Sequence, residues 1–151
     1  MAMERSFSTH LERKYLDEKD WRAALLVAAA NLERAFFQKL FFEKQIPANL
    51  MDNWTLGIYI KWVTELGLVD KKIIPVLQKF KKVRNLAVHD YSYMEQIVKN
   101  PERQAKLRAL IGQILDFIEQ YKTQYERDPS QETKHAEFLG KRRKKVGASG
   151  I

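Results

Sequence analysis

The fold class is decided by residues 21–42, which read WRAALLVAAANLERAFFQKLFF. Apolar side chains recur every three or four residues from Trp21 to Leu40, which is the spacing of one face of an α-helix. Asp20 precedes the run and is its expected N-cap, because a carboxylate accepts hydrogen bonds from the free N–H groups of a first turn. The segment therefore predicts a long helix that begins at Trp21.

The end of this helix is more apolar than a single buried face requires. Phe36, Phe37, Phe41 and Phe42 point in several directions around the helix axis. A helix that is apolar on more than one face needs more than one partner. We expect the second face to form a subunit interface, and a deep position in the core is the alternative explanation.

Three further helices are expected. Proline lacks the N–H that a helix interior needs, so Pro47 separates the first helix from the second. Asp52 or Asn53 is the expected N-cap of the second helix, which runs to Leu66, and Gly67 fits its C-terminal end.

The third helix begins after Asp70, with Pro75 in its first turn, and the fourth opens with Asn100 as its cap and Pro101 at its first position. No segment keeps the two-residue alternation of a strand for long. The chain is therefore expected to be all-α, an antiparallel bundle of about four to five helices.

The 151 residues are 45% hydrophobic and 30% charged, a composition that can bury one core. Residues 1–128 are expected to form a single helical domain. Residues 129–151 are polar and basic and are expected to form a flexible C-terminal tail.

Several classes of protein are excluded by composition. The chain has no cysteine, so it has no disulfides, thiolate zinc sites or cysteine nucleophiles. No apolar run approaches the roughly 18–20 residues that span a bilayer, and residues 1–10 show no secretory signal. Nucleotide-binding glycine loops, serine-hydrolase elbows and zinc-protease motifs are missing. We expect a soluble, cytoplasmic protein with no cofactor and no metal.

The chain carries a formal charge of +8, with 27 Lys and Arg residues against 19 Asp and Glu residues. Two regions dominate this charge: residues 71–84 and the run Lys141, Arg142, Arg143, Lys144 and Lys145. A basic surface attracts polyanions through contacts with phosphate groups. The alternative is that these side chains only keep the protein soluble, and charge alone does not separate the two.

The candidate for chemistry is residues 82–91, which read KVRNLAVHDY. Asn85 and His89 are four residues apart and share one face of a continuous helix. Arg84 lies about 140° around the helix from His89. The side chains can reach one cleft if the helix ends near His89, which Asp90 favours.

These residue types suit phosphodiester chemistry. Arg84 offers a fixed charge and paired donors for phosphate oxygens, and His89 titrates near neutral pH and can move a proton. RNA supplies its own nucleophile, the 2′-hydroxyl. In the structural alternative, Arg84 pairs with a carboxylate, His89 is a favourable cation at a helix end, and Tyr91 closes the edge of the core.

Residues 84–91 resemble the signature of the HEPN superfamily, an Arg with a polar neighbour that is followed after a few residues by a His. The ending His-x-Tyr resembles the HepT-like toxins of toxin–antitoxin pairs. The order of the helices agrees, and the resemblance covers residues 21–125. Its middle part is also similar to the mannitol-operon repressor group, whose members share the bundle and are not established nucleases.

The resemblance implies a metal-independent endoribonuclease, the toxin of a toxin–antitoxin or phage-defence system, that cleaves tRNA or mRNA. Two copies of the motif would face each other in a homodimer, where Arg84 and His89 hold the scissile phosphate. Asn85 would orient His89 or bind phosphate. Tyr91 would support the site or be modified by an antitoxin, which would be a nucleotidyltransferase.

The expected RNA-binding residues are Lys79, Lys81, Lys82 and the run Lys141, Arg142, Arg143, Lys144 and Lys145. The competing hypothesis is a HEPN-like regulatory protein, a repressor or a partner-binding module, that cleaves nothing.

Overall fold

The structure is a computed structural model that describes residues 9–125. These residues form six α-helices and no strand, which confirms the all-α prediction. The helices are α1 (His10–Asp17), α2 (Trp21–Lys44), α3 (Leu56–Glu65), α4 (Ile74–His89), α5 (Tyr91–Lys99) and α6 (Pro101–Tyr125), with a short 3-10 helix at Ala48–Leu50. The predicted tail, residues 129–151, lies outside the described residues.

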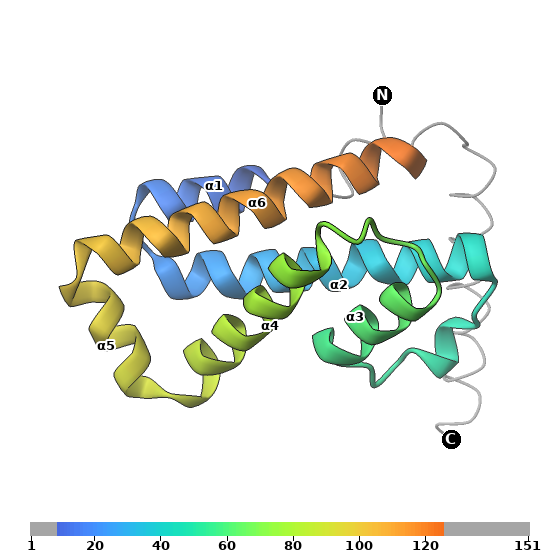
Figure 1. Ribbon diagram of the computed structural model, residues 1–151, viewed down its shortest axis with the longest axis horizontal. Helices are drawn as coiled ribbons and strands as arrows, with labels where there is room; N and C mark the ends of the chain where they lie inside the picture. The colour runs from blue at the N-terminus through green and yellow to red at the C-terminus, as the bar shows by residue number, and fades with distance from the viewer. Residues whose placement is uncertain (1–8, 126–151) are drawn as a thin grey trace, which may run out of the picture.

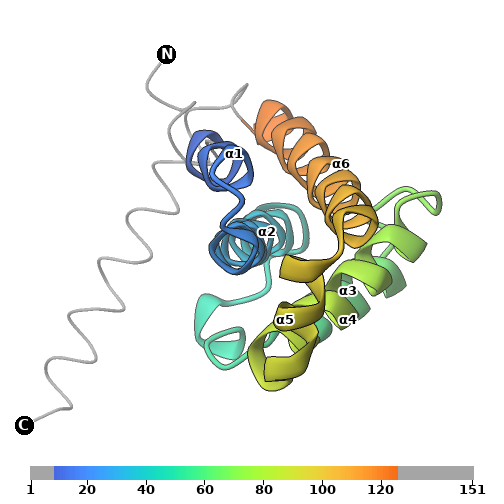
Figure 2. The same cartoon turned by 90° about the vertical axis from the view of Figure 1, so that its left-hand side faces the viewer.

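The long helix α2 is the centre of the bundle. It is packed against α1, α3, α4 and α6, and α5 joins α4 to α6 at one end of the molecule (Figures 1 and 2). Leu32 and Phe36 of α2 are fully buried, and the Phe36 ring contacts Phe117 and Tyr121 of α6, with ring centroids 5.9 and 5.7 Å apart. The core therefore lies between α2 and α6.

The N-terminus of α2 is as predicted, because an oxygen of Asp20 accepts a hydrogen bond from the Ala23 N–H at 3.3 Å. The surplus aromatic surface divides into two parts. Phe36 lies in the core, whereas Phe37, Phe41 and Phe42 are half-buried and their rings contact one another. The core alternative is thus confirmed for Phe36, and the subunit interface stays a prediction.

Helix α3 begins later than predicted, at Leu56, and its N-cap is neither Asp52 nor Asn53. Thr55 is the cap, and its Oγ1 accepts a hydrogen bond from the Ile58 N–H at 3.5 Å. Met51 is buried and its N–H donates to the Ala48 carbonyl at 3.0 Å, so the preceding residues belong to a turn anchored in the core. Gly67 follows α3 with a φ of +67°, as its position predicted.

Residues 82–91, the candidate for chemistry, end at the boundary between α4 and α5. Asp90 separates α4 from α5, and its Oδ1 accepts hydrogen bonds from the N–H of Ser92 at 3.1 Å and from its hydroxyl at 2.7 Å. The predicted end of the third helix near His89 is therefore correct. Asn100 caps α6, as predicted, by accepting from the N–H groups of Glu102 and Arg103 at 3.0 and 3.2 Å.

Two short helices, α1 and α5, were not predicted. Both are amphipathic, and each is held to the bundle through its buried side chains, Leu16 for α1 and Ile97 for α5. Within residues 9–125, no helix combines the length and the apolar character that crossing a membrane requires.

Candidate functional site

Arg84 lies on the inner side of α4. It follows Phe80 by four residues and precedes Ala87 by three, and both of these neighbours are buried. That spacing turns the arginine side chain toward the bundle rather than into solvent. Its Nη1 donates a hydrogen bond to Oδ1 of Asn85 at 3.3 Å.

The guanidinium of Arg84 is not fully satisfied. Its Nε is buried and has no hydrogen-bond acceptor among the described residues. A buried donor without a partner costs free energy of folding, so this arrangement is not what packing alone would favour. A buried group without a partner calls for an explanation, and a role in catalysis or binding is one such explanation.

Glu33 of α2 is the acidic residue that acts on Arg84. Burial raises the pKa of the Glu33 carboxyl, whereas the charge of Arg84 and a hydrogen bond from the Leu56 backbone lower it. No ion pair within 4 Å joins the two side chains in the part of the chain that the structure describes. Burial, the charge of Glu33 and that of Asp52 together raise the pKa of Tyr59 to about 12.

Helices α3 and α4 approach each other closely beside this arginine. A Cβ atom added to Gly57 would lie 3.3 Å from Cδ of Lys81, so the lysine side chain rests against the start of α3. A larger residue at Gly57 would push this side chain away. Glu33, Gly57, Lys81 and Arg84 thus bring α2, α3 and α4 together at one place.

His89 is the last residue of α4 and is exposed, as is Asn85. Among residues 9–125, no hydrogen bond or ion pair connects His89 with Arg84 or Asn85. The structure therefore brings Arg84 and Asn85 together and leaves His89 apart, at the end of the same helix. Hydrogen bonds from Ser92 hold the pKa of the adjacent Asp90 below its usual value.

Tyr91 is 81% exposed at the start of α5. The alternative in which this ring closes the edge of the core is therefore wrong. An exposed phenol two residues beyond the end of α4 is accessible to a partner or a modifying enzyme.

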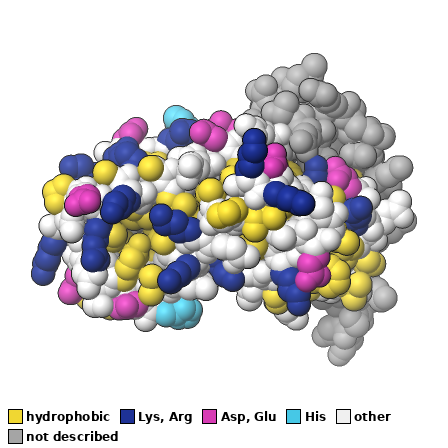
Figure 3. Space-filling model, viewed as in Figure 1, with side chains coloured by type: hydrophobic (Ala, Val, Ile, Leu, Met, Phe, Trp, Pro, Cys, Tyr) yellow, Lys and Arg dark blue, Asp and Glu magenta, His cyan; other side chains and the backbone are white. Residues whose placement is uncertain are grey.

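The predicted lysines of α4 do not share one face. Lys81 packs against α3, whereas Lys79 lies toward α6 and lines a hollow of about 340 Å³ with Lys106. Lys82 is exposed. Lys and Arg side chains are spread among hydrophobic ones over the face shown in Figure 3. The other predicted cations, Lys141 to Lys145, lie outside the described residues.

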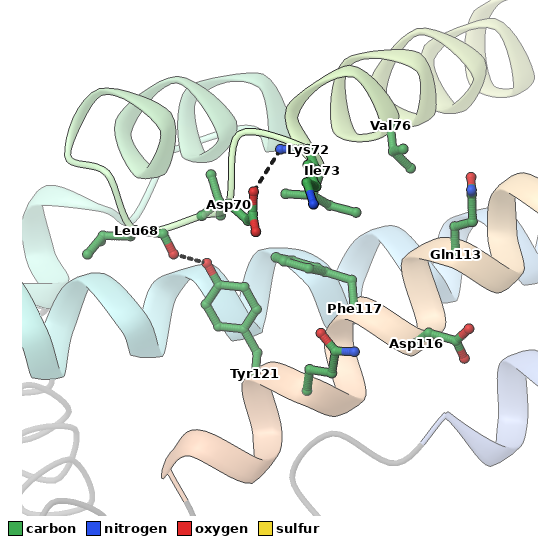
Figure 4. A pocket seen from close by; sticks show the side chains of 11 residues that line it. Leu68, Asp70, Lys72, Ile73, Val76, Gln113, Asp116, Phe117 and Tyr121 are labelled. Carbon is green, nitrogen blue, oxygen red and sulfur yellow. Dashed lines mark hydrogen bonds between the residues drawn. The ribbon is translucent and has the colours of Figure 1, made fainter.

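A second hollow, of about 580 Å³, lies between α6 and the connection from α3 to α4 (Figure 4). Its two carboxylates already have partners: Asp70 accepts from the Lys72 N–H at 2.9 Å, and Asp116 pairs with Arg13 at 3.2 Å. The residues that line the hollow include no histidine, and the hydroxyl of Tyr121 donates a hydrogen bond to the Leu68 carbonyl. These side chains do not suggest a particular reaction in this hollow.

The chemistry available around Arg84 is therefore phosphate binding, and the exposed His89 lies apart from it at the end of the same helix. Within residues 9–125, no three His, Asp or Glu side chains are grouped to hold a metal ion. Sequence reasoning identified Arg84, Asn85 and His89 but missed Glu33. A carboxylate within a mostly apolar stretch, such as Glu33, can indicate a functional residue. Glu33 and Arg84 are far apart in the sequence, however, so no short motif connects them.

No family model, curated protein or solved structure matches the chain. The function of the site is therefore inferred from its side chains and from the resemblance of residues 84–91.

Proposed function

We propose that the chain is an endoribonuclease of HEPN type that cleaves RNA with Arg84 and His89 and needs no metal ion. The observation that carries the proposal is the state of Arg84, a partly buried guanidinium with an unsatisfied donor, on the same helix as an exposed histidine. A preorganised cation placed where negative charge develops is a strong means of stabilising a transition state.

The reaction would proceed at a single phosphodiester. The RNA 2′-hydroxyl attacks the adjacent phosphorus, the bond to the 5′-oxygen breaks, and the products carry a 2′,3′-cyclic phosphate and a 5′-hydroxyl. His89 would take the proton from the 2′-hydroxyl or give one to the leaving oxygen. The terminal nitrogens of Arg84 would stabilise the charge on the phosphate oxygens, with Asn85 holding the guanidinium.

A homodimer would complete the site. His89 is not in contact with Arg84 inside one chain, and two facing copies could supply the two groups to one phosphate. The dimer, a toxin–antitoxin or defence role, an antitoxin partner and a tRNA or mRNA substrate are parts of the same proposal. They rest on the HEPN resemblance.

The test is cleavage of RNA in EDTA by the purified protein and by His89→Ala. We expect the wild type to cleave and His89→Ala to be inactive with an unchanged helical circular dichroism spectrum, because His89 is exposed. His10→Ala, which removes another exposed histidine on α1, is the matched control and should stay active. Activity that survives His89→Ala would contradict the proposed chemistry.

The separation of His89 from Arg84 specifically favours one second candidate, a regulatory protein that binds RNA or a partner without cleaving it. This candidate predicts no cleavage by any variant and RNA binding that persists in His89→Ala.

A further inference from the structure

Helix α1 packs on a side of α2 that is built from small residues. It lies against α2 and beside α6 (Figures 1 and 2). Asn31 of α2, which contacts α1, follows Ala24 by seven residues and Ala28 by three, so the three share one face of the helix. Ala24 and Ala28 are fully buried. A polar group that α1 places against this face therefore finds few partners on α2.

Glu12 of α1 is such a polar group. Its side chain is 1% exposed, and its Oε2 accepts a hydrogen bond from Nδ2 of Asn31 at 2.9 Å. Its Oε1 is buried and has no donor within residues 9–125. A single neutral amide does not replace the water that a carboxylate loses on burial, so the ionised form of Glu12 is costly in this position.

The charged neighbours of Glu12 do not remove this cost. Arg13 directs its Nη2 to Asp116 and Glu119 of α6, at 3.2 and 3.1 Å, and its Nε to the hydroxyl of Thr9 at 3.2 Å. Burial raises the pKa of Glu12, and the charge of Glu119 raises it further. Asn31 and Arg13 lower it without cancelling the rise. Glu12 therefore faces a neutral amide from α2, a carboxylate from α6 and an arginine that is engaged elsewhere.

We infer that α1 is a proton-sensitive element, which docks firmly on α2 while Glu12 is neutral and opens from the bundle more readily once Glu12 is ionised. Opening gives the carboxylate back its water and uncovers the face of α2 that carries Ala24 and Ala28. A helix of eight residues is unstable alone, so α1 depends on this docking for its structure. The inference does not depend on the proposed RNA chemistry.

The direction of the pH effect separates Glu12 from other groups of α1. The ion pairs of Arg13 need ionised carboxylates, so acid weakens them and rising pH does not. His10 is exposed in the first turn, where a positive charge opposes the helix dipole, so the loss of that charge at higher pH would tighten α1. Glu18, exposed at the other end of α1, would act in the same direction as Glu12. Glu18→Gln is therefore the matched control.

Amide hydrogen exchange of the full chain, followed by mass spectrometry between pH 5 and 8, tests the inference. Each rate is divided by the rate of an unstructured peptide at the same pH, and α3, which lies away from α1 (Figures 1 and 2), reports opening of the whole bundle. We expect α1 to exchange faster than α3 at every pH. Protection of α1 should fall with rising pH by up to about tenfold for each unit by which folding raises the pKa of Glu12.

Protection of α1 should stay constant with pH in Glu12→Gln, whereas Glu18→Gln should follow the wild type. Asn31→Asp supplies a second test, because two carboxylates that share a site raise one pKa strongly, so the fall in protection should move to higher pH. A fall in Glu12→Gln as steep as in the wild type, or an unchanged pH range in Asn31→Asp, would overturn the inference. Equal protection of α1 and α3 would also overturn it, since α1 would then open only with the whole bundle.

Discussion

At the scale of single residues, the unusual feature is the environment of the Arg84 side chain. Its Nε is buried without an acceptor, which costs about 1–3 kcal/mol in a typical protein. Glu33 of α2 lies close enough for the charge of Arg84 to lower the pKa of its carboxyl, although burial raises that pKa more. A phosphate oxygen would supply the acceptor that the Arg84 guanidinium lacks, so this residue is a candidate for phosphate binding.

Glu33→Gln tests this positioning. The substitution removes the charge that acts on Arg84 and keeps the size of the side chain. We expect cleavage to slow about tenfold, as for the loss of one positioning interaction, while the melting temperature stays the same or rises. Stability is spared because burial raises the pKa of Glu33, so a neutral amide is less costly there than a carboxylate.

Glu65→Gln, an exposed glutamate of α3, is the matched control and should leave both quantities unchanged. Parallel losses of rate and melting temperature in Glu33→Gln would show a purely structural role.

The sequence could predict only part of this site. Arg84, Asn85 and His89 lie within one short segment, so their residue types and spacing were visible. The action of Glu33 on Arg84 depends on the tertiary approach of α2 and α4. The division of Lys79 and Lys81 between two sides of α4 depends on how α4 packs against α3 and α6, whereas in the sequence the two lysines differ in nothing but position.

At the scale of helices, the predicted boundaries succeeded where the decisive interaction is local. Asp20 and Asn100 accept hydrogen bonds from N–H groups two or three residues ahead. The predicted start of α3 was wrong because three residues that can cap a helix lie close together, namely Asp52, Asn53 and Thr55. Met51 is buried in the core, so Asp52 and Asn53 lie in the turn after it and Thr55 caps the helix. Helices as short as α1 and α5 are marginal alone and depend on packing.

Helix α1 is docked through a buried carboxyl. Glu12 is 1% exposed, its Oε2 accepts from Asn31 at 2.9 Å, and its Oε1 has no partner in the described part of the chain. Burial raises its pKa above 4.5, against the hydrogen bond from Asn31 and the charge of Arg13, while the charge of Glu119 raises it further. The folded protein therefore holds this proton more tightly than the unfolded chain.

This shift predicts how stability depends on pH. The contribution of Glu12 is complete below pH 4.5 and is lost as the pH rises through the raised pKa. Glu12→Gln should remove that loss, so the free energy of unfolding in urea should fall less steeply with rising pH than in the wild type. Equal slopes for the two proteins would show that Glu12 does not titrate differently on folding.

At the scale of the whole molecule, the proposed active site needs two chains. We expect light scattering to give about twice the 17.8 kDa mass of the chain. The physical reason is that His89 and Arg84 are not joined within one chain, so a second copy would supply the missing group. A monomer at micromolar concentration would remove the shared site and favour the regulatory protein.

The net charge of +8 favours polyanionic partners in general, but it does not identify a reaction. The central claim is that the 2′-hydroxyl of RNA is the nucleophile and that the protein supplies Arg84 and His89 around the phosphate. The most direct measurement compares an RNA substrate with the same substrate carrying one 2′-deoxy nucleotide at the mapped cleavage position, both in EDTA. Cleavage of the first to a 2′,3′-cyclic phosphate, with the second intact at that position, is the predicted result. Cleavage of the 2′-deoxy substrate there, a 5′-phosphate product or a requirement for a divalent ion would contradict it.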